Sequence, residues 1–370
     1  MSRSPARIKG RSAAACAAAL ASMALFAAGC GDDDEDSASS SGAGGAQLAP
    51  VKDYLVEHAG DLAANVARLQ DVADRYYELA RSEGFDYAAM MQDHRAEVEE
   101  LMTEAKEAFV DANPSYEEME GIVAGVPRLA HYDVDIDAGS DASDPESAVS
   151  FSLRVPGGDT MKQPGNLFFL TETALYGTNP DLQAKGAEPD IDGDGQVEFG
   201  EGLADARIFK ATVGEFTRQA SALRQDAREF EPTPSDAFTA ITIMTPTMSE
   251  YFEAWKNSHF VAGNRATEQG FVAASRLQDI ADILEGIVFT YEGVQPLVAG
   301  ENPAQARQTE RELRSLLEFA SSLRDREADG EKFTAEQADA FGAEAQTQAE
   351  AIAGQVTQSA ERLNVQLQEG

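Results

Sequence analysis

Apolar residues recur every three to four positions along most of the chain, which is the spacing of one face of an α-helix. This pattern predicts long helices at 51–81, 85–111, 203–230, 233–260, 268–298, 303–327 and 334–368. Short connections between such helices are typical of helical bundles, so we expect an all-α fold.

Proline and capping residues predict where several of these helices end. Asn113 and Pro114 predict the end of the second helix, because proline cannot donate its backbone nitrogen to a helical hydrogen bond. Ser115 and Glu118 have the spacing of a capping box, which predicts a short further helix. Pro246 predicts a kink in the helix at 233–260.

Residues 131–165 differ from the helical segments, since they are rich in Asp, Ser, Gly and Pro. Val149, Phe151, Leu153 and Val155 alternate with polar residues, which predicts a short β-hairpin. The preceding residues 131–137 are expected to form a loop. The loop carries three alternating carboxylates, which either gather a cation or are simply solvated: Asp133, Asp135 and Asp137.

The N-terminus has the features of a lipoprotein signal peptide. Four basic residues precede an apolar stretch at 13–28, and small residues then lead to Cys30. We expect cleavage after residue 29 and lipidation of Cys30. Ordinary secretory cleavage is the alternative. The acidic and Ser/Gly-rich residues 30–50 predict a disordered tether. The expected location is therefore extracytoplasmic, on the periplasmic or cell-surface side of the bacterial cell membrane.

The charge of the chain limits its partners. It has 29 basic and 65 acidic residues, a formal charge of −36. Loss of four basic residues with the signal peptide changes this to −40. Proteins that bind the phosphate backbone need clustered Lys and Arg, so a nucleic-acid partner is not expected. Cleavage also leaves Cys30 as the one cysteine, so no disulfide or cysteine-ligated metal is expected.

Residues 190–201, DIDGDGQVEFGE, match a calcium loop of the EF-hand type. Calcium takes six to eight oxygen ligands, and such loops supply them at fixed positions. The predicted ligands are Asp190, Asp192, Asp194, the Gln196 carbonyl, Glu198 through a water, and Glu201. Proline and glycine residues before the loop leave no place for an entering helix. We therefore expect a single structural calcium loop.

Two further patterns leave alternatives open. Arg276 and Asp279 are three residues apart on a predicted helix, where they form either a buried polar seam or a surface pair. The aromatic-rich segment 251–264 contains the single tryptophan, and either packs in a core or lines a pocket. The chain has no metalloprotease, lipase or nucleotide-binding motif, so an enzyme is not expected.

The run from Asn166 to Gly177, NLFFLTETALYG, resembles the signature of the imelysin family, whose core is G-x-H-x-x-E. Residues 251–284 are similar to the second half of imelysin-like lipoproteins. The resemblance covers about residues 50–368. It implies two four-helix-bundle-like halves, at 51–230 and 231–370, with the functional site between them. In this alignment Glu172 matches the glutamate of the motif, whereas Phe169 replaces its histidine.

The family includes the lipoprotein component of the Efe iron-uptake system, of the EfeO/EfeM type. The resemblance implies a lipid-anchored metal-binding protein of iron uptake, with a membrane permease and a peroxidase as partners. Calcium and iron are the expected ions, and Glu172, with the 131–137 segment, would contact the iron. One alternative is a calcium-dependent binding module for an acidic polysaccharide. A metallopeptidase is the less favoured alternative, because Phe169 cannot ligate a metal.

Overall fold

The computed structural model describes residues 45–368, which lie within one compact unit. The predicted signal peptide, Cys30 and most of the predicted tether lie outside the described residues. Among the described helices, none combines the length and apolar character needed to cross a membrane.

The described chain is mostly helical and contains one small sheet, which confirms the predicted all-α class. The elements are α1 (Ala49–Ser82), α2 (Tyr87–Val123), α3 (Ala130–Asp133), η1 (Val134–Ala138), β1 (Ser152–Arg154), β2 (Thr160–Lys162), α4 (Leu167–Leu175), η2 (Pro180–Leu182), α5 (Ala206–Glu229), α6 (Pro234–Met244), η3 (Thr245–Thr247), α7 (Met248–Asn257), α8 (His259–Ala262), η4 (Gly263–Arg265), α9 (Arg276–Glu301), α10 (Pro303–Ala328) and α11 (Ala335–Arg362).

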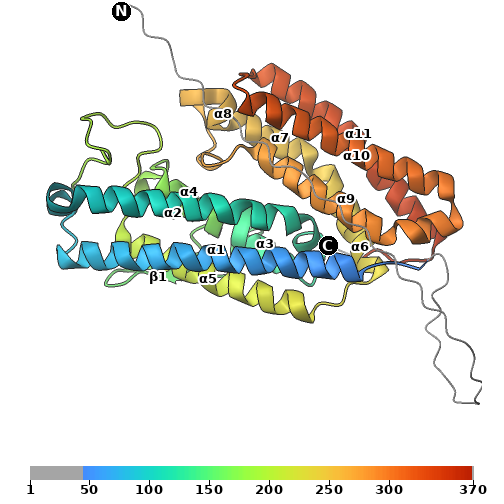
Figure 1. Cartoon of the computed structure of the whole chain (residues 1–370), viewed down its shortest axis with the longest axis horizontal. Coiled ribbons are helices and arrows are strands. Elements are labelled where there is room, and N and C mark those ends of the chain that lie inside the picture. Colours follow the sequence, from blue (N-terminus) through green and yellow to red (C-terminus); the bar gives the residue numbers. More distant parts are fainter. Residues whose placement is uncertain (1–44, 369–370) are drawn as a thin grey trace, which may run out of the picture. The chain divides into compact units, whose positions relative to one another are not determined.

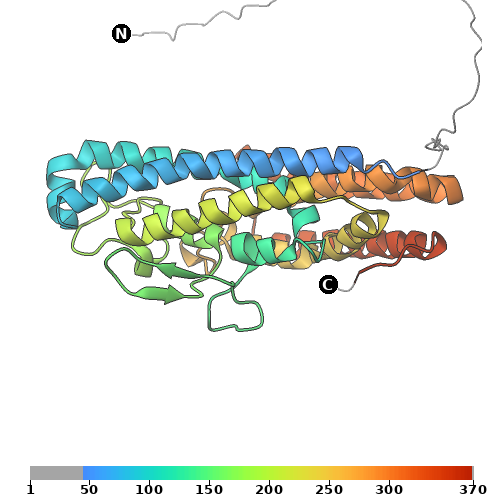
Figure 2. The ribbon, with the colours of Figure 1, turned by 90° about the horizontal axis from the view of Figure 1, so that it is seen from below.

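The first apolar core is built on α1, α2 and α5, and α1 packs against both of the others (Figure 1). Its buried side chains run from Val51 to Phe230 and include Ala240 from α6. The predicted hairpin is present and packs beside α5 (Figure 2). Its strands are antiparallel, with Leu153 opposite Met161. Leu153 is buried, so the hairpin closes one side of this core.

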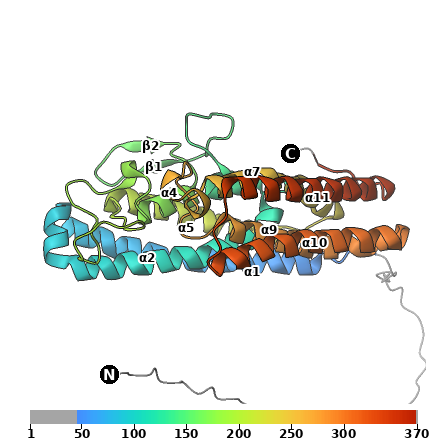
Figure 3. The same ribbon diagram turned by 90° about the horizontal axis from the view of Figure 1, so that it is seen from above.

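The second apolar core is built on α6, α7, α9, α10 and α11. Helices α10 and α11 run alongside each other (Figure 3). Trp255 of α7 is fully buried and contacts the rings of Phe252 and Phe333. Part of the aromatic-rich segment therefore packs in a core, as one of the two alternatives predicted.

Helices α2 and α9 join the two cores through close backbone contact. A methyl group at Gly286 of α9 would lie 2.1 Å from the Glu118 carbonyl oxygen of α2. A methyl group at Gly121 of α2 would lie 2.9 Å from the Ile287 side chain. The absence of a Cβ at these positions lets the helices approach closely. The acidic residues on the neighbouring face of α2 are thereby placed between the cores.

The prediction that the second helix ends at Pro114 was wrong. Helix α2 continues through Pro114 to Val123, and the predicted capping residue Ser115 lies inside it. The Ser115 hydroxyl donates to the Asp111 carbonyl, and the Asn65 side chain of α1 donates to the same carbonyl. Packing against α1 and α9, with these side-chain donors, outweighs the hydrogen bond that proline removes.

The prediction of a loop at 131–137 was also wrong. Residues 130–138 form the short helix α3 followed by the π-helical turn η1. The alternation of aspartates is typical of extended or irregular chain, but Tyr132 and Ile136 are four residues apart and both buried. Burial of these two side chains on one side favours a helical turn.

Two predicted helix boundaries were wrong near the C-terminal half. Helix α9 begins at Arg276, with Ser275 as its N-cap, and not at 268. Residues 268–275 are irregular, and the Glu172 side chain accepts hydrogen bonds from the backbone N–H groups of residues 271–273 in this segment. Helix α11 ends at Arg362, and the left-handed backbone of Asn364 follows shortly after.

Candidate functional site

A cavity of about 530 Å³ lies where the two cores meet. Its walls come from α2, α3, η1, α4, α6, α7, the irregular segment before α9 and the first residue of α9. Both aromatic rings and ionisable groups line it. The ionisable groups are Glu117, Glu120, Asp133, Asp137, Glu172, Glu250, Glu268, Tyr251 and Arg276. Seven of these are carboxylic acids and one is a guanidinium, so the cavity is acidic.

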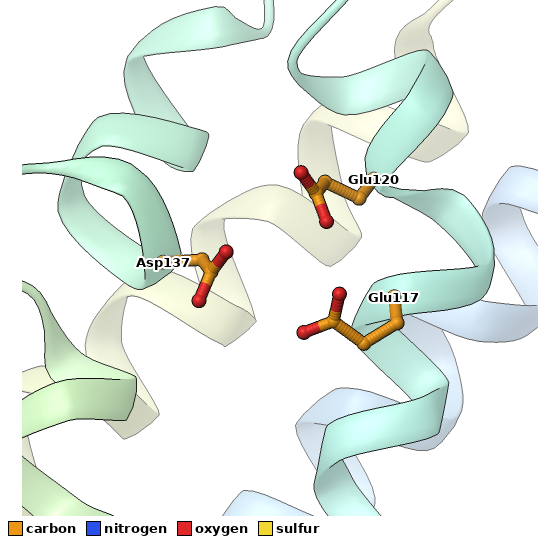
Figure 4. Close-up of side chains that lie close together, drawn as sticks. All are labelled: Glu117, Glu120 and Asp137. Atoms are coloured by element: carbon orange, nitrogen blue, oxygen red, sulfur yellow. The ribbon is translucent and has the colours of Figure 1, made fainter. Parts of the chain in front are cut away.

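Three of the carboxylates form a tight acidic cluster: Glu117, Glu120 and Asp137. Oxygen atoms of the three approach within 4.8 Å of one another. Glu117 and Glu120 are three residues apart on α2, which places them on one face of the helix. Asp137 faces them from η1, and the three carboxylates point toward a common space (Figure 4).

Burial makes the charged state of this acidic cluster costly. Glu117 and Glu120 are 1% and 2% exposed. Among the described residues, neither Glu117 Oε2 nor Glu120 Oε2 has a hydrogen-bond partner. Desolvation raises the pKa of Glu120 to about 7, with the Asp137 charge adding to the effect. Desolvation and the neighbouring acids raise the pKa of Glu117 well above its usual range.

Arg276 is the cationic partner of the acidic cluster. Its guanidinium lies 3.5 Å from Glu117, 3.8 Å from Asp137 and 3.2 Å from Asp279. Arg276 is 5% exposed and Asp279 is 1% exposed. Of the two alternatives predicted for this pair, the buried polar seam is the one observed. The side chain of Asn113 from α2 completes the seam by donating to Asp279 at 2.9 Å.

The aspartates at 133, 135 and 137 have three different surroundings. Asp137 belongs to the acidic cluster, and Asp133 lines the same cavity while accepting a 2.7 Å hydrogen bond from Tyr116. Asp135 faces away, toward Ser150 and Gln219, which both donate to it. Asp133 and Asp137 are four residues apart in helical chain, which explains why both lie on the side that faces the cavity.

Glu172 of α4 also lines the cavity, where its carboxylate accepts three backbone hydrogen bonds. The donors are the N–H groups of Phe271, Val272 and Ala273, at 2.7, 2.8 and 2.8 Å. Desolvation nevertheless raises the pKa of Glu172 to about 7, against the lowering effect of these donors. Phe169, one turn earlier, contributes its ring to the cavity wall.

The predicted calcium loop brings its first three acidic side chains together. Oxygens of Asp190, Asp192 and Asp194 lie within 4.8 Å of one another. Glu201 turns back across the loop, accepting from the N–H groups of Ile191 and Glu198 at 2.9 and 2.7 Å. Gln196 and Glu198 are exposed on the far side of the turn. The structure thus brings together the first three predicted ligands, while the Glu201 carboxylate binds backbone N–H groups of the loop.

Side chains from two helices hold this loop. Arg95 of α2 donates to the Asp190 carbonyl, and Lys106 of α2 donates to the Gly200 carbonyl at 2.7 Å. Phe199 stacks on His259 of α8, with ring centroids 3.7 Å apart and an interplanar angle of 6°. The loop thus contacts both the first core and the segment that leads to the cavity wall.

Sequence reasoning missed Glu117 and Glu120. Both lie in the stretch that the spacing of Ser115 and Glu118 predicts to be a short separate helix, and their burial depends on α2 continuing past Pro114. An available signal was the E-x-x-E spacing inside a stretch that also contains the apolar residues Met119 and Ile122, which are buried as well. Two buried acidic side chains require positive charge nearby. Arg276 supplies one positive charge beside Glu117.

The fold and this site define an all-helical protein with a buried acidic cavity between two apolar cores. The family model for imelysin, named Peptidase_M75, matches residues 55–361. The match covers well over half of the chain, so the protein belongs to the imelysin family. A search of the curated proteins found no match to the chain.

Proposed function

We propose that this protein binds a metal cation at Glu117, Glu120 and Asp137. The observation that carries the proposal is the buried Glu120 Oε2, which has no hydrogen-bond partner among the described residues, beside Glu117 Oε2, which has only an ion pair with Arg276 at 3.5 Å. An unpartnered buried carboxylate oxygen is costly, and a dehydrated cation between three carboxylates would remove that cost.

The donor set favours a hard cation. All three groups are carboxylates, and hard cations prefer oxygen ligands, whereas soft ions prefer thiolate or imidazole. Phe169 cannot replace the histidine of the family signature as a ligand. Ferric iron is a hard cation, and membership of the imelysin family supports iron as the cargo. The proposed role is a lipid-anchored, extracytoplasmic component of iron uptake that delivers iron to a membrane permease and works alongside a peroxidase.

We further propose a structural calcium ion in the loop at 190–201. The sequence matches the loop pattern at every ligand position, and the first three aspartates converge. Calcium would neutralise these charges and fix the loop against α2 and α8. This second ion is proposed to be structural and not cargo, because the loop is exposed while the acidic cluster is buried.

Binding without catalysis is the proposed mode of action, despite the peptidase name of the family model. Metal-assisted hydrolysis needs a metal with an open coordination position and a general base beside it. In the acidic cluster, Arg276 occupies the space beside two of the carboxylates. That arrangement favours storage of a cation over activation of a water molecule.

Metal analysis of two variants tests these proposals. The purified protein would be dialysed against ferric citrate and calcium, and each metal would be counted per chain by mass spectrometry. We expect one iron and one calcium in the wild type. Glu117→Gln with Glu120→Gln should lose iron alone, and Asp192→Asn with Asp194→Asn should lose calcium alone. A wild-type protein that takes up no iron, or keeps it in the first variant, contradicts the proposed cargo site.

A further inference from the structure

We propose, building on the proposed cation site, that Glu172 is a positioning residue and not a ligand of the bound cation. Its carboxylate holds the backbone of residues 271–273, and this backbone places Phe271 and Arg276 beside the acidic cluster. The resemblance to the family signature had pointed to Glu172 as a contact of the ion.

The first argument is that the Glu172 carboxylate is already occupied. Oε2 accepts from Phe271, and Oε1 accepts from Val272 and Ala273, at 2.7 to 2.8 Å. Three N–H groups in a row around one anion form a backbone anion site. A cation at Glu172 would have to compete with these three donors. The carboxylates that approach within 4.8 Å of one another are Glu117, Glu120 and Asp137, without Glu172.

The second argument is the backbone conformation that Glu172 stabilises. Phe271 has φ +52°, in the left-handed region that residues with a Cβ rarely adopt. Such a conformation costs about 1–2 kcal/mol and persists only where its surroundings impose it. Gly270 precedes it, and a methyl group there would lie 3.3 Å from Glu172 Oε2. Glu172 supplies the contacts that keep this segment out of the helical conformation.

The third argument is the path from this backbone to the cluster. The Phe271 ring lies 4.7 Å from the Arg276 guanidinium carbon, and the Tyr251 ring lies 4.4 Å from it. The guanidinium is thus fixed by two aromatic rings while it contacts Glu117 and Asp137. Glu172 lies on α4, so its carboxylate connects an element of the first core to the start of α9.

Europium(III) luminescence lifetimes in H₂O and D₂O, which count the water molecules on the bound ion, separate a ligand from a positioning residue. The measurement uses a background of Asp190→Asn, Asp192→Asn and Asp194→Asn, so that only the cavity site is read. We expect Glu120→Gln, the ligand control, to add about one bound water or to abolish binding. Glu172→Gln should leave the water count unchanged and weaken binding about tenfold.

Phe271→Gly provides the second arm, because glycine adopts positive φ without strain and removes the ring. If Glu172 acts through Phe271, Glu172→Gln should change the europium Kd less than twofold in the Phe271→Gly protein. An added water in Glu172→Gln, an equal loss of affinity in both backgrounds, or no change in Kd at all would overturn the positioning role. Absence of europium binding in the background protein would instead overturn the proposed cation site, and this inference with it.

Discussion

Arg276 is the residue that most influences the electrostatics of the cavity. Its single positive charge lies near the carboxylates of Glu117, Asp137 and Asp279. The rings of Tyr251 and Phe271 lie within 5 Å of its guanidinium carbon. A buried guanidinium both stabilises neighbouring carboxylates and repels an incoming cation. The same side chain therefore favours folding and opposes tight cation binding.

Replacement of this charge should separate the two effects. In Arg276→Met we expect cation affinity to rise at least about tenfold, because a unit charge near the proposed ion disappears. The free energy of unfolding without metal should fall by about 3–5 kcal/mol, since buried carboxylates lose their partner. Isothermal titration and urea unfolding measure these quantities. Arg81→Met, at the exposed pair with Glu78, is the matched control. Weaker cation binding in Arg276→Met would contradict this view of the site.

Asp282 of α9 is a second buried acid at the residue scale, outside the proposed ligand set. Desolvation raises its pKa to about 7, and the charges of Asp279 and Glu118 add to this while Gln278 and Arg324 oppose it. Among the described residues, Asp282 Oδ2 has no hydrogen-bond partner. The folded protein therefore binds this proton more tightly than the unfolded chain does.

The stability of the protein should consequently depend on the Asp282 proton. As pH rises from about 4 to 7, the contribution of Asp282 lowers the free energy of unfolding, by up to about 4 kcal/mol at about 1.4 kcal/mol per pKa unit. Asp282→Asn cannot ionise, so it should remove this part of the pH dependence and be more stable than the wild type at pH 7.5. Urea unfolding at pH 5 and 7.5 tests this. Parallel pH profiles for the two proteins would exclude the effect.

At the scale of elements, the contact between α2 and α9 decides whether the site exists. The E-x-x-E pair on α2 faces Arg276 on α9 only because the helices approach backbone to backbone at Gly286. The sequence predicted most helices, the hairpin and the kink near Pro246 correctly. It failed at Pro114 and at 131–137, where long-range packing overrides local preference.

Gly286→Ala should disrupt this contact. The new methyl group would lie 2.1 Å from the Glu118 carbonyl oxygen, so the helices must separate. We expect a loss of about 2–3 kcal/mol in the free energy of unfolding. Gly354→Ala in α11 is the matched control, because nothing lies within 4 Å of the added methyl group. The control should gain about 0.5–1 kcal/mol from helix propensity. Thermal unfolding of both variants measures the difference, and equal stability would contradict the tight contact.

At the scale of the whole molecule, the loop at 190–201 contacts both the first core and α8. If calcium fixes this loop, it should stabilise the fold as a unit. For a Kd of about 10⁻⁴ to 10⁻³ M, 10 mM calcium contributes about 1.4–2.7 kcal/mol. We expect a Tm increase of about 2–4 °C by differential scanning fluorimetry. Asp192→Asn with Asp194→Asn should abolish the increase. An equal increase with magnesium would indicate nonspecific screening of charge.

The sequence by itself determined the helical class, the positions of most helices, the calcium-loop pattern and the resemblance that the family match confirms. These depend on residues close together along the chain, where periodicity and spacing have direct physical meaning. Only the tertiary structure decided that Glu117 and Glu120 meet Asp137, that Arg276 is buried among them, and that Glu172 binds a backbone segment about 100 residues away. Such contacts arise where α2 packs against α9 and where α4 contacts the segment that precedes α9. No local sequence pattern encodes which helix faces will meet.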